Sequence, residues 1–375
     1  MNRLRELQKY GQSAWLDYIR RDMLVDGSLQ RLVEEDGIGG LTSNPAIFQQ
    51  AIAESDLYDR AIREILNRNR SATVVEIYET LAVQDIQMAA DILLPKHRAT
   101  QGVDGHVSLG VSPHLARDSA GSVTEARHLW QLVNRPNLLI KIPATAECIP
   151  AVEQLLSEGI NVNITLMFSL AHYEAVAQAY LRALGRSSEP QQMASVASFF
   201  VSRVDTAVDA ELERLGSERA LGLRGRIAVA NAKLTYQRYL ELFYGKDFEH
   251  WREMGARPQR VLWASTSTKN PDYRDVMYVE ELIGDDTVNT IPPSTLESFR
   301  DHGVCRAALS ADIDGARAAL RELDELGIDL GVVGEELQRV GVEKFAKPFD
   351  SLLETLGIKR AEILEEMAIR SLVEG

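Results

Sequence analysis

Residues 138–144 read Leu138-Leu139-Ile140-Lys141-Ile142-Pro143-Ala144, an almost wholly apolar stretch with one lysine. A short apolar run that ends at a proline predicts a buried β-strand, on which successive side chains point to opposite faces. Lys141 then lies away from bulk water, and its pKa is expected to fall because burial disfavours the charged amine. A neutral amine in an apolar pocket is the nucleophile that Schiff-base chemistry needs. The alternative is a lysine at a strand end that extends to water or pairs with a carboxylate, and this stretch alone leaves both open.

Further short segments have strand character, and helix-period patterns separate them. They cover residues 13–19, 38–45, 107–112, 160–168, 195–203, 260–267 and 287–293. Eight strands that alternate with helices predict an α/β fold, a (β/α)8 TIM barrel, with additional helices at the N-terminus (residues 1–10) and at the C-terminus. An open doubly wound sheet usually carries a glycine-rich phosphate turn after its first strand, and none follows Ile19. Since no linker or internal repeat divides the chain, we expect residues 1–375 to form a single domain with decorating helices.

Polar side chains recur on one face of these predicted strands. They are Asp17, Ser108, Lys141, Asn163, Thr165 and Ser265. In segment 160–168 the apolar alternation from Ile160 to Leu166 takes the opposite face. In a closed barrel the polar faces converge on one axis, where buried polar groups can satisfy one another's hydrogen bonds.

The composition excludes some classes of protein. The chain has 41 basic and 55 acidic residues and no basic run, which argues against nucleic acid as the main partner. The two cysteines, Cys148 and Cys305, form neither a disulfide framework nor a zinc pattern, so a reducing cytoplasm fits best. The N-terminus does not resemble a signal peptide, and no apolar run approaches the roughly 20 residues of a membrane span. We expect a cytoplasmic protein that does not bind membranes; its oligomeric state stays open.

Five motifs, in order along the chain, resemble those of the transaldolase family. They are residues 40–48 (Gly-Leu-Thr-Ser-Asn-Pro-Ala-Ile-Phe), 139–145 (Leu-Ile-Lys-Ile-Pro-Ala-Thr), 161–169 (Asn-Val-Asn-Ile-Thr-Leu-Met-Phe-Ser), 195–205 (Ser-Val-Ala-Ser-Phe-Phe-Val-Ser-Arg-Val-Asp) and 263–271 (Trp-Ala-Ser-Thr-Ser-Thr-Lys-Asn-Pro). The tail from Gly341 to Asp350 resembles the long bacterial form of that family. The resemblance covers nearly the whole chain.

The resemblance implies transfer of a dihydroxyacetone unit from a ketose phosphate to an aldose phosphate, without a metal or an organic cofactor. Lys141 would attack the ketose carbonyl and form an iminium, the electron sink for cleaving the adjacent carbon–carbon bond. Asp17 would take the proton from the hydroxyl whose carbon becomes the released aldehyde, or would pair with Lys141 at other steps. Thr165 would hold the catalytic water; otherwise it is an ordinary β-branched strand residue. The expected substrates are fructose 6-phosphate, sedoheptulose 7-phosphate, erythrose 4-phosphate and glyceraldehyde 3-phosphate, of the pentose phosphate pathway.

The remaining matched positions would bind substrate. They are Thr42, Asn44, Asn163, Ser198, Phe200, Arg203, Ser265 and Lys269. Arg203, with Ser265 and Lys269, would hold the phosphate, because a guanidinium suits bidentate phosphate contacts. The alternative for Arg203 is a surface charge at a strand end.

Three of these positions have more specific expectations. Asn44 would hold substrate hydroxyls, although it also suits a turn before a proline. Ser198 would contact the three-carbon unit. Phe200 stands where a tyrosine would suggest a simple fructose-6-phosphate aldolase, so it favours transfer over net cleavage.

Three positions depart from the family pattern. Gly110 replaces a glutamate that works through a bound water, while Cys148 and Ser267 replace glycines in loops that we expect to shape the pocket mouth. General acid–base groups contribute about 10²–10⁴-fold to a rate, so loss of the glutamate predicts a slow enzyme rather than a dead one. Three hypotheses follow: an ordinary transaldolase, a repurposed enzyme that acts on another sugar or keto substrate, and a weakly active or non-catalytic protein that binds sugar phosphates.

Overall fold

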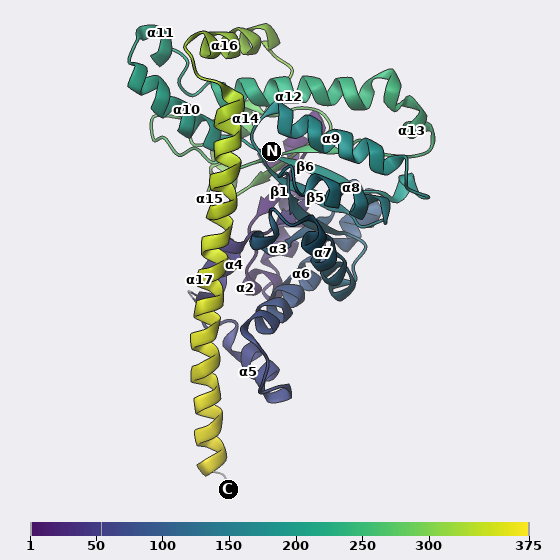
Figure 1. Ribbon diagram of the computed structural model, residues 1–375, viewed down its shortest axis with the longest axis vertical. Helices are drawn as coiled ribbons and strands as arrows, with labels where there is room; N and C mark the ends of the chain where they lie inside the picture. Colours follow the sequence, from purple (N-terminus) through teal and green to yellow (C-terminus); the bar gives the residue numbers. More distant parts are fainter. Residues whose placement is uncertain (1, 54, 374–375) are drawn as a thin grey trace.

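The computed structural model describes residues 2–53 and 55–373, so Met1, Glu54, Glu374 and Gly375 lie outside the described residues. Eight parallel strands close into one barrel in chain order, and helices surround them (Figure 1). The strands are β1 (Gln12–Asp17), β2 (Gly40–Thr42), β3 (His106–Gly110), β4 (Leu138–Pro143), β5 (Val162–Met167), β6 (Ser195–Phe200), β7 (Arg260–Ala264) and β8 (Thr287–Ile291). The predicted (β/α)8 barrel with extra helices is therefore confirmed, and the open sheet is excluded.

The α-helices connect these strands and extend the chain at both ends. They are α1 (Arg3–Glu6), α2 (Arg21–Val25), α3 (Ser28–Arg31), α4 (Pro45–Ala53), α5 (Asp59–Arg68), α6 (Val74–Ala99), α7 (Ser119–Val133), α8 (Ile149–Ser157), α9 (Leu170–Leu184), α10 (Ser202–Leu215), α11 (Glu218–Leu221), α12 (Ile227–Tyr244), α13 (Glu249–Glu253), α14 (Met277–Glu281), α15 (Pro293–His302), α16 (Ile313–Glu325) and α17 (Leu330–Val373). Short single-turn segments complete the set: η1 (Leu7–Tyr10), η2 (Leu32–Asp36), η3 (Pro113–Leu115), η4 (Pro190–Gln192) and η5 (Lys246–Phe248). Among the described residues, no helix is both long and apolar enough to cross a bilayer.

Strand β4 occupies the position that its apolar sequence predicts. All six of its residues are buried. Lys141 lies beside Gly110 of β3 and Asn163 of β5 in the strand register. A strand buried on both faces is typical of parallel barrels, because helices cover the outer face.

Strands β6 and β5 differ from the prediction at positions that affect the site. Strand β6 ends at Phe200, so Arg203 lies in the first turn of α10 and not at a strand end. In β5 the register shifts between Ile164 and Met167, and Leu166 adopts a left-handed conformation with φ of 64°. The extra residue in the ladder breaks the two-residue alternation. The prediction that Leu166 shares the outer face with Ile164 is therefore wrong: Leu166 lines a cavity at the end of the barrel.

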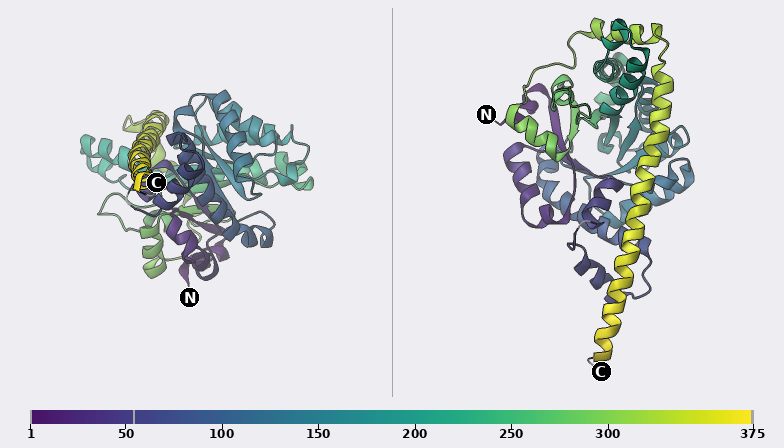
Figure 2. Two further views of the ribbon diagram at one scale, coloured as in Figure 1. Left: turned by 90° about the horizontal axis from the view of Figure 1, so that it is seen from below. Right: turned by 90° about the vertical axis from the view of Figure 1, so that its left-hand side faces the viewer.

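The C-terminal helix α17 is the longest element, with 44 residues. It runs along one side of the barrel, and its C-terminal end projects beyond the other helices (Figures 1 and 2). It packs against α4 and α6 and contacts strand β5. Helix α17 therefore contacts both the outer helices and a strand of the barrel.

The N-terminal end of the barrel contains a buried ion pair. Arg260, the first residue of β7, donates to Asp104 at 3.0 Å. Ser13 Oγ and Trp15 Nε1, both from β1, donate to the same carboxylate at 2.8 Å and 3.2 Å. These contacts link β1 and β7, the two neighbours of β8, through the segment that precedes β3. They lie at the end of the barrel opposite the cavity described next.

Candidate active site

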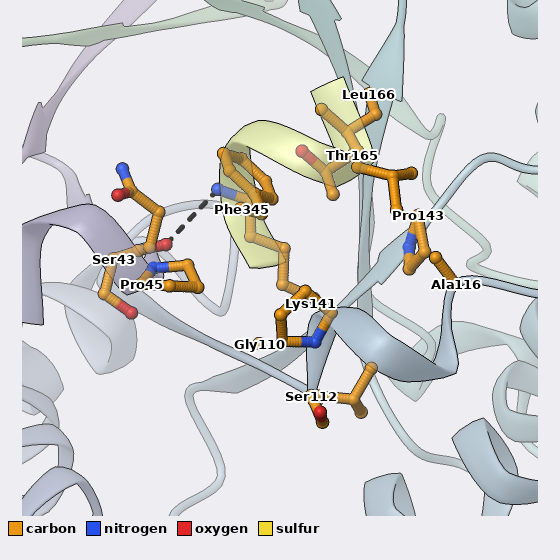
Figure 3. A pocket seen from close by; sticks show the side chains of 14 residues that line it. Ser43, Pro45, Gly110, Ser112, Ala116, Lys141, Pro143, Thr165, Leu166 and Phe345 are labelled. Carbon is orange, nitrogen blue, oxygen red and sulfur yellow. Dashed lines mark hydrogen bonds between the residues drawn. The ribbon is translucent and has the colours of Figure 1, made fainter. Parts of the chain in front are cut away.

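A cavity lies at the C-terminal ends of β3, β4 and β5, which is the end where (β/α)8 barrels carry their active sites. Its lining comes from the strand ends, the loops that follow them and α17: Ser43, Asn44, Pro45, Gly110, Val111, Ser112, Pro113, Ala116, Lys141, Pro143, Thr165, Leu166, Val342 and Phe345 (Figure 3). Of the predicted site residues, Asn44, Lys141 and Thr165 line this cavity directly. Asp17 and Asn163 adjoin it, Asp17 through its charge interaction with Lys141 and Asn163 as the strand partner of Lys141, whereas the other predicted residues are not part of its lining.

Lys141 is held inside the cavity with little access to water. Its side chain is 8% exposed, and Nζ donates to the backbone carbonyl of Ser43 at 3.3 Å (Figure 3). Burial lowers the pKa of the Lys141 amine, and the negative charge of Asp17 opposes this shift only in part. A larger share of the amine is therefore neutral, and nucleophilic, than for a lysine in water.

Asp17 is the last residue of β1 and interacts electrostatically with Lys141. Thr42 Oγ1 donates to Asp17 Oδ1 at 2.7 Å and also lies 2.7 Å from the hydroxyl of Thr290. Burial raises the pKa of the Asp17 carboxyl, while Lys141, the hydrogen bond from Thr42 and the charge of Arg203 lower it. A carboxyl with a raised pKa beside an amine with a lowered pKa is suited to proton transfer.

A buried hydrogen-bond chain fixes the amide of Asn163. Ser198 Oγ donates to Asn163 Oδ1 at 2.6 Å, and Asn163 Nδ2 donates to Ser108 Oγ at 3.0 Å. Strands β6, β5 and β3 supply these three groups, on both sides of Lys141. The amide next to Lys141 is therefore held in one orientation by its neighbours.

Thr165 is a buried residue with an unpaired hydroxyl. Its Oγ1 has no hydrogen-bond partner among the described residues, although the side chain lines the cavity. A buried hydroxyl without a partner costs free energy unless a ligand or water satisfies it. The hydroxyl thus lies unpaired and buried within the wall of the cavity.

Two cations lie close together next to this site. Arg203 places its guanidinium over the ring of Phe200, 5.4 Å from the centroid, and its Nη1 is buried without a partner among the described residues. Lys269 donates to Ser267 Oγ at 2.7 Å, and burial, followed by the charge of Arg203, lowers the pKa of Lys269. Ser265 joins this group through a 2.9 Å hydrogen bond with Ser202, the residue before Arg203. The cluster offers an anion two positive charges and a hydroxyl.

Asn44 has a structural role as well as a place in the cavity wall. Its Oδ1 accepts a hydrogen bond from the backbone N–H of Ile47 at 3.1 Å, in the first turn of α4. The turn role expected for an asparagine before a proline is thus present in the structure.

The three positions that we expect to depart from the family pattern lie in different surroundings. A Cβ added at Gly110 would meet only Lys141 Cβ, at 4.0 Å, so this position faces free space in the cavity. Cys148 is fully buried, and its thiol contacts the backbone carbonyls of Leu115 and Ala116 at 3.5 Å and 3.4 Å. Cys148 therefore lies behind the cavity wall and not at its mouth. Ser267 contacts Lys269 in the cation cluster.

Sequence reasoning assigned no site role to Phe345, Val342 or Ser43. Phe345 and Val342 lie on α17, some 200 residues after Lys141 in the chain. Their segment resembles the long bacterial form of the family, but that resemblance implied no site role for them. Figure 3 shows Phe345 above the same cavity as Lys141. Only the packing of α17 on the barrel brings these side chains to the site.

Comparisons with known proteins all indicate one family, and the matches cover most of the chain. The family model described as Transaldolase/Fructose-6-phosphate aldolase matches residues 14–356. A transaldolase of Thiobacillus denitrificans is 49% identical over 361 residues, covering 95% of this chain and 100% of that protein. A transaldolase of Thermobifida fusca is 46% identical, covering 94% of this chain and 96% of that protein. A transaldolase of Mycolicibacterium paratuberculosis is 44% identical, covering 94% of this chain and 95% of that protein.

Proposed function

Because this chain belongs to the Transaldolase/Fructose-6-phosphate aldolase family, we propose that it transfers a dihydroxyacetone unit between sugar phosphates through a Schiff base on Lys141. The observation that carries this proposal is the environment of Lys141. Its amine is buried in a cavity at the catalytic end of the barrel, its pKa is lowered, and Asp17 interacts with it. These are the conditions under which a lysine attacks a carbonyl.

The proposed reaction begins with the neutral amine of Lys141. It adds to the ketose carbonyl, the carbinolamine loses water, and an iminium forms. Asp17 takes the proton of the hydroxyl on the fourth carbon, the bond between the third and fourth carbons breaks, and its electron pair passes to the iminium as an enamine. The aldehyde product leaves. The enamine then attacks the acceptor aldehyde, Asp17 returns the proton to the new hydroxyl, and water releases the ketose product.

The surrounding groups have separate roles in this scheme. Thr165, with its unpaired hydroxyl, would hold the water that leaves and returns. Asn44, Asn163 and Ser198 would contact the three-carbon unit and the adduct, and Thr42 would orient Asp17 through its hydrogen bond. Phe200 would close the site beside Arg203.

The cation cluster would hold the phosphate. Arg203 would provide the main contact, with Ser265 and Lys269 beside it. The substrates we propose are fructose 6-phosphate, sedoheptulose 7-phosphate, erythrose 4-phosphate and glyceraldehyde 3-phosphate. A place in the pentose phosphate pathway and in the cytoplasm stays a prediction, as does a single domain over residues 1–375.

A second candidate rests on Gly110. The free space at this position would admit a substituent that a larger side chain excludes. A repurposed enzyme that acts on another sugar or keto substrate would use that space. It would still form an adduct on Lys141, whereas a non-catalytic sugar-phosphate-binding protein would not.

Borohydride trapping separates these functions. Fructose 6-phosphate with borohydride should add mass to the peptide that contains Lys141, and Lys141→Ala should abolish the addition. Lys344→Ala, at an exposed position of α17, is the control and should leave it intact. Labelling at a different lysine would contradict the mechanism. Transfer from fructose 6-phosphate to erythrose 4-phosphate would distinguish a transaldolase from a repurposed enzyme, which would form an adduct without this transfer.

A further inference from the structure

Helix α17 approaches the catalytic strand ends more closely than most side chains would permit. A Cβ at Gly341 would lie 3.0 Å from Leu166 Cδ2, and one at Gly334 would lie 3.0 Å from Ser169 Cβ. Glycines at these positions let the helix backbone come close to the end of β5. The residue between them that faces the same strand end is Gln338.

Gln338 ties together the ends of two catalytic strands. Its side chain is buried, at 7% exposure, and Nε2 donates to two backbone carbonyls, those of Ala144 and Leu166, at 3.0 Å each. Ala144 follows β4, which carries Lys141. The backbone N–H of Ala144 donates in turn to Thr165 O at 2.7 Å. One amide group from α17 therefore connects the segments that follow Lys141 and Thr165.

The carbonyl of Leu166 belongs to a strained residue. Leu166 has φ of 64°, in the left-handed region, where a side chain with a Cβ is disfavoured. Such a conformation is energetically unfavourable and persists only where surrounding contacts hold it. The hydrogen bond from Gln338 is one of those contacts, and Thr165, with its unpaired hydroxyl, immediately precedes Leu166.

We propose that Gln338 is a positioning residue for the reaction. It holds Leu166 in its left-handed conformation, and so sets the position of the buried Thr165 hydroxyl in the cavity wall. Its effect falls on the steps in which water leaves and returns during formation and hydrolysis of the iminium. This inference rests on the proposed function. The alternative is that Gln338 only anchors α17 on the barrel.

Replacing the amide distinguishes the two roles. Gln338→Met keeps the volume of the side chain but removes both donors. Glu336→Met, at an exposed position of the same helix, is the matched control. We expect Gln338→Met to lower kcat for transfer at least tenfold with KM changed less than twofold, because substrate contacts stay in place. Hydrogen exchange should accelerate at the amides of residues 163–168 and stay unchanged in β1.

Other outcomes decide against the proposal. A kcat within twofold of the Glu336→Met control, or unchanged exchange at residues 163–168, would overturn it. A rise in KM equal to the fall in kcat would also overturn it, in favour of anchoring alone. If wild-type protein transfers nothing, the proposed function fails, and exchange alone then decides whether Gln338 holds this segment.

Gln338→Glu provides a second variant in case the methionine variant does not fold. A protonated carboxyl can donate to one of the two carbonyls, whereas a carboxylate repels both. We expect the ratio of variant to wild-type kcat to fall as pH rises and the carboxyl ionises. A ratio independent of pH would contradict the positioning role.

Discussion

The chemistry of single residues at this site depends on which strand face they occupy. Lys141 and Gly110 are partners in the register of β3 and β4, so both face the cavity. Burial makes the lysine more nucleophilic by lowering its pKa. The glycine beside it leaves free space where a side chain could act on the same intermediate.

Gly110→Glu should raise kcat for fructose 6-phosphate and erythrose 4-phosphate, on the order of tenfold or more, because a carboxylate would assist proton transfer through water. KM should change little, since the gain arises mainly in the transition state. Gly110→Gln has a similar volume without an ionisable group, and steady-state kinetics should show no gain for it. An equal gain in both variants would assign the effect to packing. Loss of activity on a different, native substrate in Gly110→Glu would favour a repurposed enzyme.

Arg203→Ala should weaken binding of phosphorylated sugars selectively. A hydrogen bond to a charged group contributes about 1.5–3 kcal/mol, so KM for fructose 6-phosphate should rise roughly 10- to 150-fold. KM for unphosphorylated fructose or dihydroxyacetone should change far less. Arg203→Lys retains the charge without the bidentate geometry and should recover only part of the loss. An equal effect on both classes of sugar would show that Arg203 is structural.

At the scale of elements, a helix remote in sequence completes the wall of the cavity. Strands supply Lys141 and Thr165, and α17 supplies Val342 and Phe345. Phe345 and Lys141 line the same cavity, so the ring of Phe345 is placed to limit the access of water to the amine. We expect the protonation of the lysine to depend on this ring.

Phe345→Ala should admit water and raise the pKa of Lys141 toward its ordinary value, because relief of desolvation favours the charged amine. The neutral amine is the reactive form, so the rising limb of kcat/KM against pH should move to higher pH. Val332→Ala, at an exposed position of the same helix, should leave the profile unchanged. A Phe345→Ala profile that coincides with that of wild type would show that Phe345 does not keep water from Lys141.

At the scale of the whole molecule, the two ends of the barrel serve different purposes. The C-terminal end holds the candidate site, and the N-terminal end holds the buried pair of Asp104 and Arg260. Burial alone would raise the pKa of Asp104, but the charge of Arg260 and the hydrogen bonds from Arg260, Ser13 and Trp15 outweigh it, and the pKa is lowered. In wild type the pair stabilises the fold above the unfolded-state pKa of Asp104, and this contribution is lost as pH falls through the folded-state pKa.

Arg260→Met should reduce the free energy of unfolding at pH 7 by about 3–5 kcal/mol, because it leaves a buried carboxylate without its partner. In the variant, only the hydrogen bonds from Ser13 and Trp15 still oppose burial, so we expect the pKa of Asp104 to rise above its unfolded-state value and the variant to lose stability as pH increases through this range. Urea denaturation should therefore show a smaller difference from wild type at pH 5 than at pH 7. Adding Asp104→Asn to the variant should recover part of the loss at pH 7. A difference independent of pH would show that Asp104 is not the group responsible.

The sequence by itself determined the features that depend on local pattern. Apolar segments of strand length between helical repeats predicted the closed barrel, and the two-residue period placed Lys141 and Thr165 on the inner face. Both follow from short-range geometry: a strand alternates its side chains wherever it is regular. The matched motifs added candidate roles, such as a phosphate contact for Arg203, that await experiment.

Only the tertiary structure decided the features that depend on distant contacts. Phe345 and Gln338 reach the site because α17 packs across the strand ends, which no local period encodes. Leu166 leaves the predicted face because the register shifts within β5, and its left-handed backbone is held by contacts that include one from α17. Arg203 lies in α10 and not at a strand end, because β6 ends at Phe200, three residues before the end that the sequence predicted. For α17 and for Leu166, contacts between distant elements outweigh the period of the local sequence.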